Sequence, residues 1–199
     1  ASGFEILPNP DSSTFQVGDV VTKRDEHDSR WDRVCSARDV FVTDLDLRVG
    51  NARAVSLTGL EGWNGKVKAS IMAAVDAQVK SDKNVIVDYD FRDALIATMA
   101  ISATVYPAEN CRRTIARLRE ANAIVRLVTG TLTATTCARV ASSSANAAST
   151  QTLSALRKYF GVNGSVSFET DKSASVCGTQ LVWGLYLNKE TPLIDRKSV

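Results

Sequence analysis

The chain has 199 residues, of which 44% are hydrophobic and 23% are charged, and its 24 basic and 22 acidic side chains leave a net charge of +2. This is the composition of an ordinary globular protein, and the near-neutral charge gives no reason to expect nucleic acid or an anionic membrane surface as the main partner. The sequence has no run of about 18 apolar residues, so no transmembrane segment is expected.

Both ends of the chain are polar, and a single domain is expected between them. Residues 1–14 contain Pro8 and Pro10 among small polar residues, which predicts an extended lead-in or tether. We expect one α+β domain over 15–190 and a polar tail over 191–199. The first residues lack the charged and then apolar pattern of a signal peptide, which suits a mature or trimmed form and equally a cytosolic chain with a tag remnant.

The first half of the domain alternates between strand-like and charged segments. Residues 15–22 and 40–49 alternate apolar with polar side chains, which predicts two strands. The charged run at 23–33 mixes both signs and is typical of a solvated loop or a turn of helix. Apolar residues at helical spacing predict a helix over 65–80, and a short strand is expected to end at 88–90.

The second half contains the longest predicted elements. Asp90 is expected to cap a helix over 91–102, and Pro107 to start another over 108–122. The remaining expected elements are a long strand over 124–140, a helix over 150–160, and a hairpin whose strands are 165–169 and 175–187.

The segment 179–187 is the strongest strand signal in the chain, because its alternate residues are uniformly apolar. We expect it to be an interior strand with Trp183 as the largest side chain of the core. Strands and helices are interspersed without regular alternation, and several strands have one polar face. The sequence therefore predicts an α+β fold, with a mixed or mostly antiparallel sheet and about four helices packed on it, and doubly wound α/β is the alternative.

Four widely spaced cysteines predict two disulfides, and four buried free thiols are the alternative. They are Cys35, Cys111, Cys137 and Cys177, and none of them forms a Cys-x-x-Cys pair. The chain also has a single histidine, so the ligand spacing of a zinc site is absent and no metal or cofactor is expected. Of the three connectivities we favour Cys111–Cys137 with Cys35–Cys177, which closes one short loop and ties the opening strands to the central one.

An apolar strand that ends in Asp88-Tyr89-Asp90 is the sharpest local motif. Two carboxylates at a strand tip can bind Mg²⁺, or one can attack a phosphoryl group while the other moves a proton. In this respect the motif superficially resembles the first motif of haloacid-dehalogenase-type phosphatases. Phe91 departs from that pattern and no Gly-Asp-x-x-x-Asp motif follows, so the family is not assigned. The competing interpretation is that Asp90 caps a helix and Asp88 is solvated.

Nucleophilic catalysis finds little support, because the only histidine, His27, lies in the charged run and no Gly-x-Ser-x-Gly motif occurs. Two other features suit contacts with a partner protein. Arg112 and Arg113 belong to a basic face of the helix expected over 108–122. The alternative interpretation is that this face contacts only solvent. Trp31 and Trp63 lie in loop-like surroundings, where aromatic side chains either contact a partner or fold back onto the core.

The sequence favours a non-catalytic function. We expect an exported domain, periplasmic, envelope-attached or secreted, that works through protein–protein contacts in a cell envelope or secretion assembly, by binding a partner or by self-assembly. The alternative is a metal-dependent hydrolase or phosphoryl-transfer enzyme that uses Asp88 and Asp90.

Overall fold

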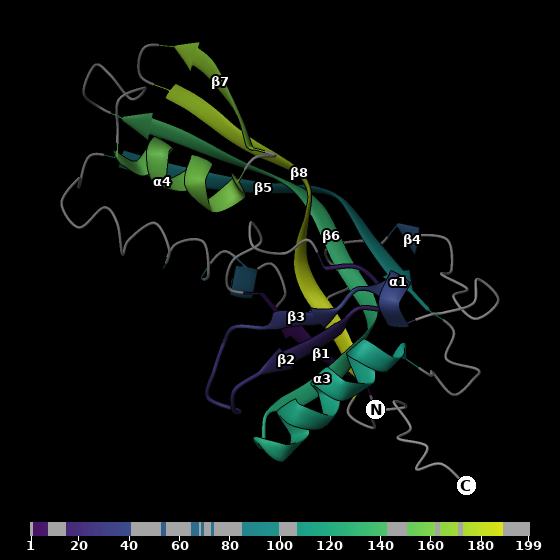
Figure 1. Cartoon of the computed structure of the whole chain (residues 1–199). Helices are drawn as coiled ribbons and strands as arrows, with labels where there is room; N and C mark the ends of the chain where they lie inside the picture. The colour runs from purple at the N-terminus through teal and green to yellow at the C-terminus, as the bar shows by residue number, and fades with distance from the viewer. Residues whose placement is uncertain are drawn as a thin grey trace, which may run out of the picture.

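The computed structural model describes residues 2–7, 15–40, 53–54, 65–67, 69, 73, 85–99, 107–142, 151–161, 164–170 and 173–188. These residues form an antiparallel eight-stranded sheet with helices packed against it (Figure 1). The expected α+β class with a mostly antiparallel sheet is confirmed. Within this part of the chain three helices have defined bounds, against about four expected, and residues 65–67, 69 and 73 of the helix expected over 65–80 also have helical backbone.

Two long strands, β6 (Ile124–Ser142) and β8 (Ser173–Asn188), run side by side through the whole molecule. In the upper half of Figure 1 they are flanked by β5 (Val85–Thr98) and β7 (Gly164–Thr170), in the order β5-β6-β8-β7. We call this part the upper sheet. In the lower half the order is β3-β2-β6-β8-β1, and we call that part the lower sheet. Its shorter strands are β1 (Ser2–Ile6), β2 (Val20–Lys23) and β3 (Asp32–Cys35), while β4 (Arg53–Ala54) pairs with β5.

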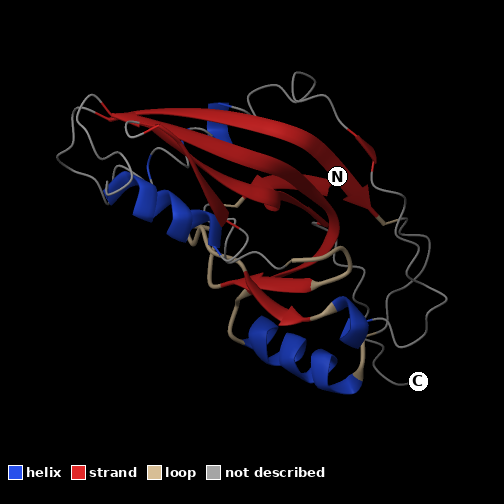
Figure 2. Ribbon diagram, turned by 90° about the horizontal axis from the view of Figure 1, so that it is seen from above, coloured by secondary structure: helices blue, strands red, loops and turns tan. Residues whose placement is uncertain are grey.

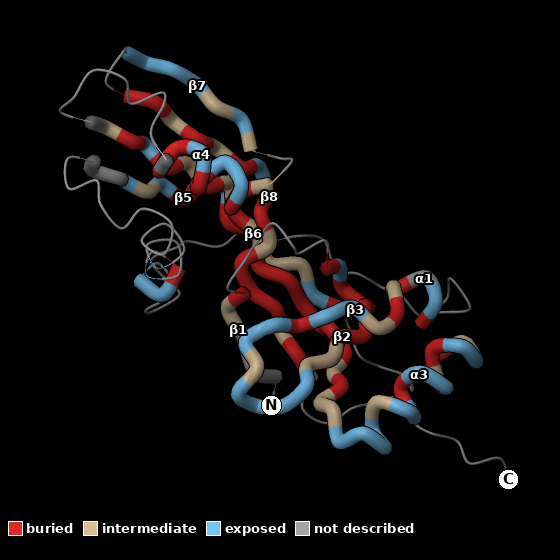
Figure 3. Tube along the Cα trace, turned by 60° about the vertical axis from the view of Figure 1, so that its left-hand side comes forward, coloured by how far each residue is buried: buried red, intermediate tan, exposed pale blue. Residues whose placement is uncertain are grey.

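One helix covers the upper sheet. α4 (Gln151–Phe160) lies against one face of these strands (Figures 2 and 3). Its apolar residues recur at helical spacing, and Leu153, Leu156 and Phe160 are buried in one cluster with residues of the strands. Trp183 is fully buried at the centre of this cluster, as expected, and its indole N–H donates to the Thr136 hydroxyl at 2.8 Å. The hydrogen bond removes the cost of burying the polar end of the largest core side chain.

The lower sheet has apolar clusters on both sides. On one side α3 (Glu109–Glu120) contributes Cys111 and Ile115, which pack with Val20 and Leu127 of the strands. On the other side Trp31 packs with residues from β2, β6 and β8. The short helix α1 (Ala37–Val40) follows β3, and the Ala108 N–H donates to the Asp39 carbonyl at 3.0 Å, which ties α1 to the start of α3.

Both expected disulfides are present, but the favoured connectivity is wrong. Cys35 bonds to Cys111, which joins β3 to α3 in the lower half. Cys137 bonds to Cys177, and these residues lie directly opposite each other on β6 and β8, with a Cα–Cα distance of 4.1 Å. The favoured connectivity rests on loop length, but the pairing of strands and the docking of α3 decide which cysteines meet.

Several expected elements are confirmed. They are the helices over 108–122 and 150–160, the long strand over 124–140, and the closing hairpin. Gly161, which follows α4, has the positive φ of 69° that makes glycine the favoured residue at a helix end.

Four expectations are wrong in the described residues. Ser2–Ile6 are not a lead-in but a strand that pairs with β8 along Asn188 to Gly184. The predicted helix after Asp90 does not form, because β5 continues to Thr98 beside β6. The strand expected over 15–22 begins only at Val20, and the end of the charged run belongs to β3.

Part of the predicted layout lies outside the described residues. The undescribed parts are residues 41–49 of the strand expected over 40–49, Trp63, and the tail over 191–199. Val40 is described and is the last residue of α1.

Candidate functional site

A hollow of about 220 Å³ opens at the end of the lower sheet, where β1, β2, β6 and β8 meet. The residues that line this hollow are far apart in the sequence, because adjacent antiparallel strands place their ends side by side. The lining residues are Glu5, Lys23, Glu26, Trp31, Ile124, Arg126 and Leu187.

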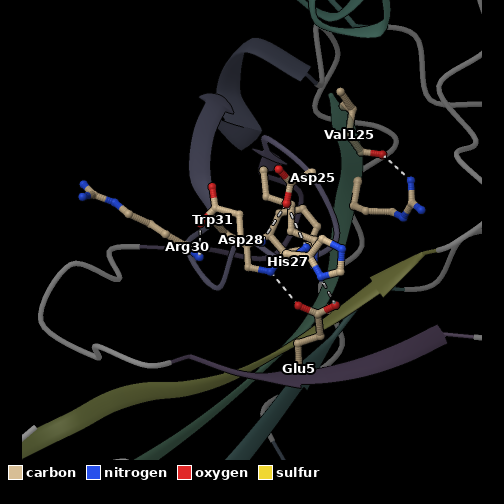
Figure 4. A network of polar contacts seen from close by, with 9 residues as sticks. Glu5, Asp25, His27, Asp28, Arg30, Trp31 and Val125 are labelled. Carbon is tan, nitrogen blue, oxygen red and sulfur yellow. Dashed lines mark hydrogen bonds and ion pairs between the residues drawn. The ribbon is translucent and has the colours of Figure 1, made fainter. Parts of the chain in front are cut away.

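Trp31 lines this hollow and lies against the Glu5 carboxylate (Figure 4). Its indole N–H donates to Glu5 Oε2 at 2.6 Å, and the Lys23 ammonium lies 4.8 Å from the ring centroid. The same ammonium is 3.9 Å from Glu5 Oε1. With 6% of its surface exposed, Trp31 is a buried packing residue whose indole N–H has a hydrogen-bond partner.

The hollow contains two cationic and two anionic side chains, so its charges balance. Lys23 is neutralised by Glu5, and the Arg126 guanidinium donates to the Val125 carbonyl at 2.9 Å. A balanced set of this kind gives little preference for an anionic or a cationic ligand.

The charged loop between β2 and β3 is shaped by its own aspartates. The Asp25 carboxylate accepts the backbone N–H groups of His27 and Asp28 at 2.9 and 3.0 Å, and Asp28 accepts that of Arg30 at 3.0 Å (Figure 4). The Arg30 hydrogen bond lowers the pKa of Asp28, against an opposing contribution from desolvation. His27 is exposed, as expected, so the loop holds its shape by local turns and presents no buried base.

Asp88 and Asp90 lie in the interior of β5, on the face of the upper sheet that points away from α4. Both are exposed, and strand geometry separates their Cα atoms by about 6.6 Å. Asp90 forms an ion pair with Arg92 at 2.5 Å. Among the described residues no group of three or more His, Cys, Asp or Glu side chains gathers to hold a metal ion. Neither interpretation from the sequence holds fully, since Asp90 caps no helix and Asp88 ends no strand.

The arginines expected on one face of the helix over 108–122 lie on α3, but they do not share one environment: helical spacing places Arg113 and Arg117 opposite the buried Cys111 and Ile115, and Arg112 at the side of that stripe. Arg113 is exposed and forms an ion pair with Glu109 one turn earlier. Arg112 is half-buried. The two arginines therefore differ in environment, and α3 brings neither of them to Trp31.

The edges of the upper sheet are the feature that the sequence analysis did not locate. β7 pairs with β8 on one side, and no described strand pairs with its other side. Residues 85–92 of β5 pair with β6, and again no described strand pairs with their outer side. Phe168 of β7 is 61% exposed, and it is the one large hydrophobic side chain in the described part of the chain that is exposed.

Comparisons with known proteins identify no family. No family model matches the chain, and no curated protein matches it. A solved structure of a bacterial gasdermin from Bradyrhizobium tropiciagri is similar to 92% of this chain and 80% of its own length, with a TM-score of 0.43 and 16% sequence identity. A likeness this distant carries no argument about function. None of the helices in the described residues is long and apolar enough to cross a membrane.

Proposed function

We propose that the chain is a non-catalytic, exported domain that binds protein in a cell-envelope or secretion assembly, and that it does so by adding a partner strand to the edge of its upper sheet. The observation that carries this proposal is the outer side of β7, with which no described strand pairs, in a strand that also bears the exposed Phe168. An open strand offers a row of backbone donors and acceptors, which pair with any extended segment, and an apolar side chain at that edge gives the contact an anchor.

The two disulfides support an oxidising compartment, where such bonds form and persist. Intact mass with and without reductant tests this part of the proposal on protein taken from its native host. Alkylation before reduction should add no label, and alkylation after reduction should label all four cysteines. Four labels without reduction would contradict export.

Sedimentation velocity over a wide range of concentrations tests the strand-addition surface. We expect Phe168→Lys to weaken association strongly, because a charge at the edge opposes pairing with another strand. Ala116→Lys is the matched control, since it adds the same charge at an exposed position of α3. If the two variants associate alike, the β7 edge is not the contact.

The same measurement separates the two sources of the added strand. A second copy of this chain makes the mass rise with concentration. If the strand comes from a different envelope protein, the purified chain stays monomeric. Cross-linking in the host should then recover that protein with the wild-type chain and not with the Phe168→Lys variant. Monomeric behaviour with no difference in cross-linking would contradict the proposal.

No observation favours the hydrolase alternative. Asp90 is engaged by Arg92 on an exposed strand face, and the described residues supply no third acidic ligand beside it. We expect Mg²⁺ to cause no saturable shift of the Asp88 and Asp90 amide resonances, and a saturable shift would revive the enzyme hypothesis.

A further inference from the structure

A pair of bulges faces each other across β6 where the upper and lower sheets join. On β5, Asp93 and Ala94 lie opposite one residue of β6, because Arg92 pairs with Thr135 and Leu95 pairs with Thr133. On β8, Thr179 and Gln180 likewise lie opposite one residue, because Gly178 pairs with Thr136 and Leu181 pairs with Ala134. An extra residue in one strand bends that strand locally, so two bulges at one level bend the sheet as a whole.

The backbone is strained in both bulges. Asp93 has a φ of 52° and Gln180 a φ of 48°, and these are non-glycine residues in the left-handed region. Such residues persist only where their surroundings hold them, and they concentrate at sites that move or bind. A Cβ added at Gly178, beside them, would lie 2.6 Å from Leu181 Cδ1, so a side chain there would displace the Leu181 side chain.

The side chain of Gln180 joins the two bulges. Its amide oxygen accepts the Thr133 hydroxyl at 2.8 Å, and its amide nitrogen donates to the Asp93 carbonyl at 3.2 Å. The Gln180 backbone N–H donates to the Thr135 hydroxyl at 3.3 Å. We call these contacts the Gln180 clamp. The clamp crosses β6 and ties β8 to β5, which are not neighbours in the sheet.

Other features of the structure also change near this level. The outer partner of β8 changes from β7, which ends its pairing at Gly178, to β1, which begins at Gly184. The apolar cluster beneath α4 reaches past this level to Leu132, Leu181 and Trp183, whereas the other two clusters lie in the lower half. Each half also has its own disulfide. In Figure 1, β6 and β8 change direction between the halves.

We propose that this level is a hinge, about which the upper sheet and α4 turn relative to the lower half, and that the Gln180 clamp holds the bent arrangement. Strained bulges supply a position where the strands bend without losing their pairing elsewhere. The apolar contacts that must adjust during the turn are those where the α4 cluster crosses this level, at Leu132, Leu181 and Trp183. The hinge does not rest on the proposed function, although it would set the orientation of the β7 edge.

Amide hydrogen exchange measured by NMR tests the proposal. In Gln180→Ala the amides of Arg92–Leu95 and Thr133–Thr136 should exchange about tenfold faster, since the loss of a hydrogen bond or two changes a local opening equilibrium by about that factor. The amides of α3 and α4 should keep their rates. Gln16→Ala, an exposed glutamine whose side chain the clamp does not involve, is the control.

Two further variants separate a hinge from a merely stabilising contact. Gln180→Glu keeps the acceptor for Thr133 but has no donor for the Asp93 carbonyl, so the β5 amides should exchange as in Gln180→Ala. It also serves as the test if the alanine variant does not fold. Asp93→Gly keeps the carbonyl and relieves the positive φ, so exchange should be unchanged or slower. Methyl relaxation dispersion should show new exchange at Leu132 and Leu181 in Gln180→Ala, and none at Ile115.

The proposal fails if Gln180→Ala exchanges like Gln16→Ala. It also fails if exchange accelerates equally at every protected amide, because the clamp would then act on global stability alone. Faster exchange in Asp93→Gly would show that the positive φ at the bulge is not a source of strain.

Discussion

Asp19 is the residue whose removal we expect to damage the lower half most. It lies just before β2 and is 1% exposed. Its Oδ1 accepts the Ala37 N–H at the start of α1 at 2.8 Å, and its Oδ2 accepts the Gln16 N–H at 2.8 Å. Arg33 of β3 places its Nε 3.1 Å from the same Oδ2. One buried carboxylate therefore connects a turn, a strand and a helix.

The cost of Asp19→Ala follows from what is left without a partner. The Ala37 N–H is buried and loses its acceptor, which costs about 1–3 kcal/mol. The Gln16 N–H and Arg33 are more exposed and turn to water, so each adds about 1 kcal/mol. The sum of about 3–5 kcal/mol agrees with the usual effect of breaking a buried ion pair and is a large part of a typical folding free energy. Asp19→Asn keeps one acceptor and should lose about half as much.

Equilibrium unfolding in urea under non-reducing conditions measures this loss. Asp32→Ala is the matched control, because Asp32 forms an ion pair with Arg30 in which both side chains are largely exposed. Such a surface pair contributes about 0–1 kcal/mol. A loss below about 1 kcal/mol for Asp19→Ala, or a loss equal to that of Asp32→Ala, would refute the reasoning from buried hydrogen bonds.

Three further predictions concern the upper half. Replacing Cys137 and Cys177 together by alanine should lower the free energy of unfolding by about 4 kcal/mol in urea titrations, because their bridge closes a separation of 40 residues in the unfolded chain. Thr136→Val keeps the shape of the side chain but leaves the Trp183 indole N–H without its acceptor, so we expect the free energy of unfolding to fall by about 1–3 kcal/mol. An unchanged free energy would show that the hydrogen bond contributes nothing. Burial raises the pKa of Tyr159, so the folded state holds that proton more tightly than the unfolded state. Stability should therefore fall as the pH rises above about 10, and less steeply in Tyr159→Phe.

The sequence predicts those elements that carry their own periodic signal. β6 and β8 are long and rich in alternating apolar residues, and α3 and α4 have apolar stripes at helical spacing after a proline or before a glycine. In each of these cases local propensity and tertiary packing agree, so the local signal is sufficient. The burial of Trp183 follows from the same alternation.

The features that sequence reasoning missed depend on neighbours distant in the chain. Residues 91–98 are apolar enough for a helix or a strand, and pairing with Thr-rich β6 decides for the strand. The Cys137–Cys177 bond depends on the register of β6 against β8, which no spacing reveals. β7 is a mostly polar strand in which Val166 packs against the core and Phe168 does not, and the exposure of Phe168 follows from the position of β7 at an edge.

The upper and lower halves are stabilised by different contacts, and this makes a prediction about cooperativity that links Asp19 to the hinge. Asp19 stabilises the lower half, whereas Leu156 reports on the upper half and Ile115 on the lower half. Urea unfolding can be measured separately with the Ile115 and the Leu156 methyl resonances. If the two halves are separate units joined at the Gln180 clamp, Asp19→Ala should lower the unfolding midpoint reported by Ile115 more than the midpoint reported by Leu156. Equal shifts would show that β6 and β8 couple the halves into one cooperative unit, because the strands would then transmit the full loss across the bulges.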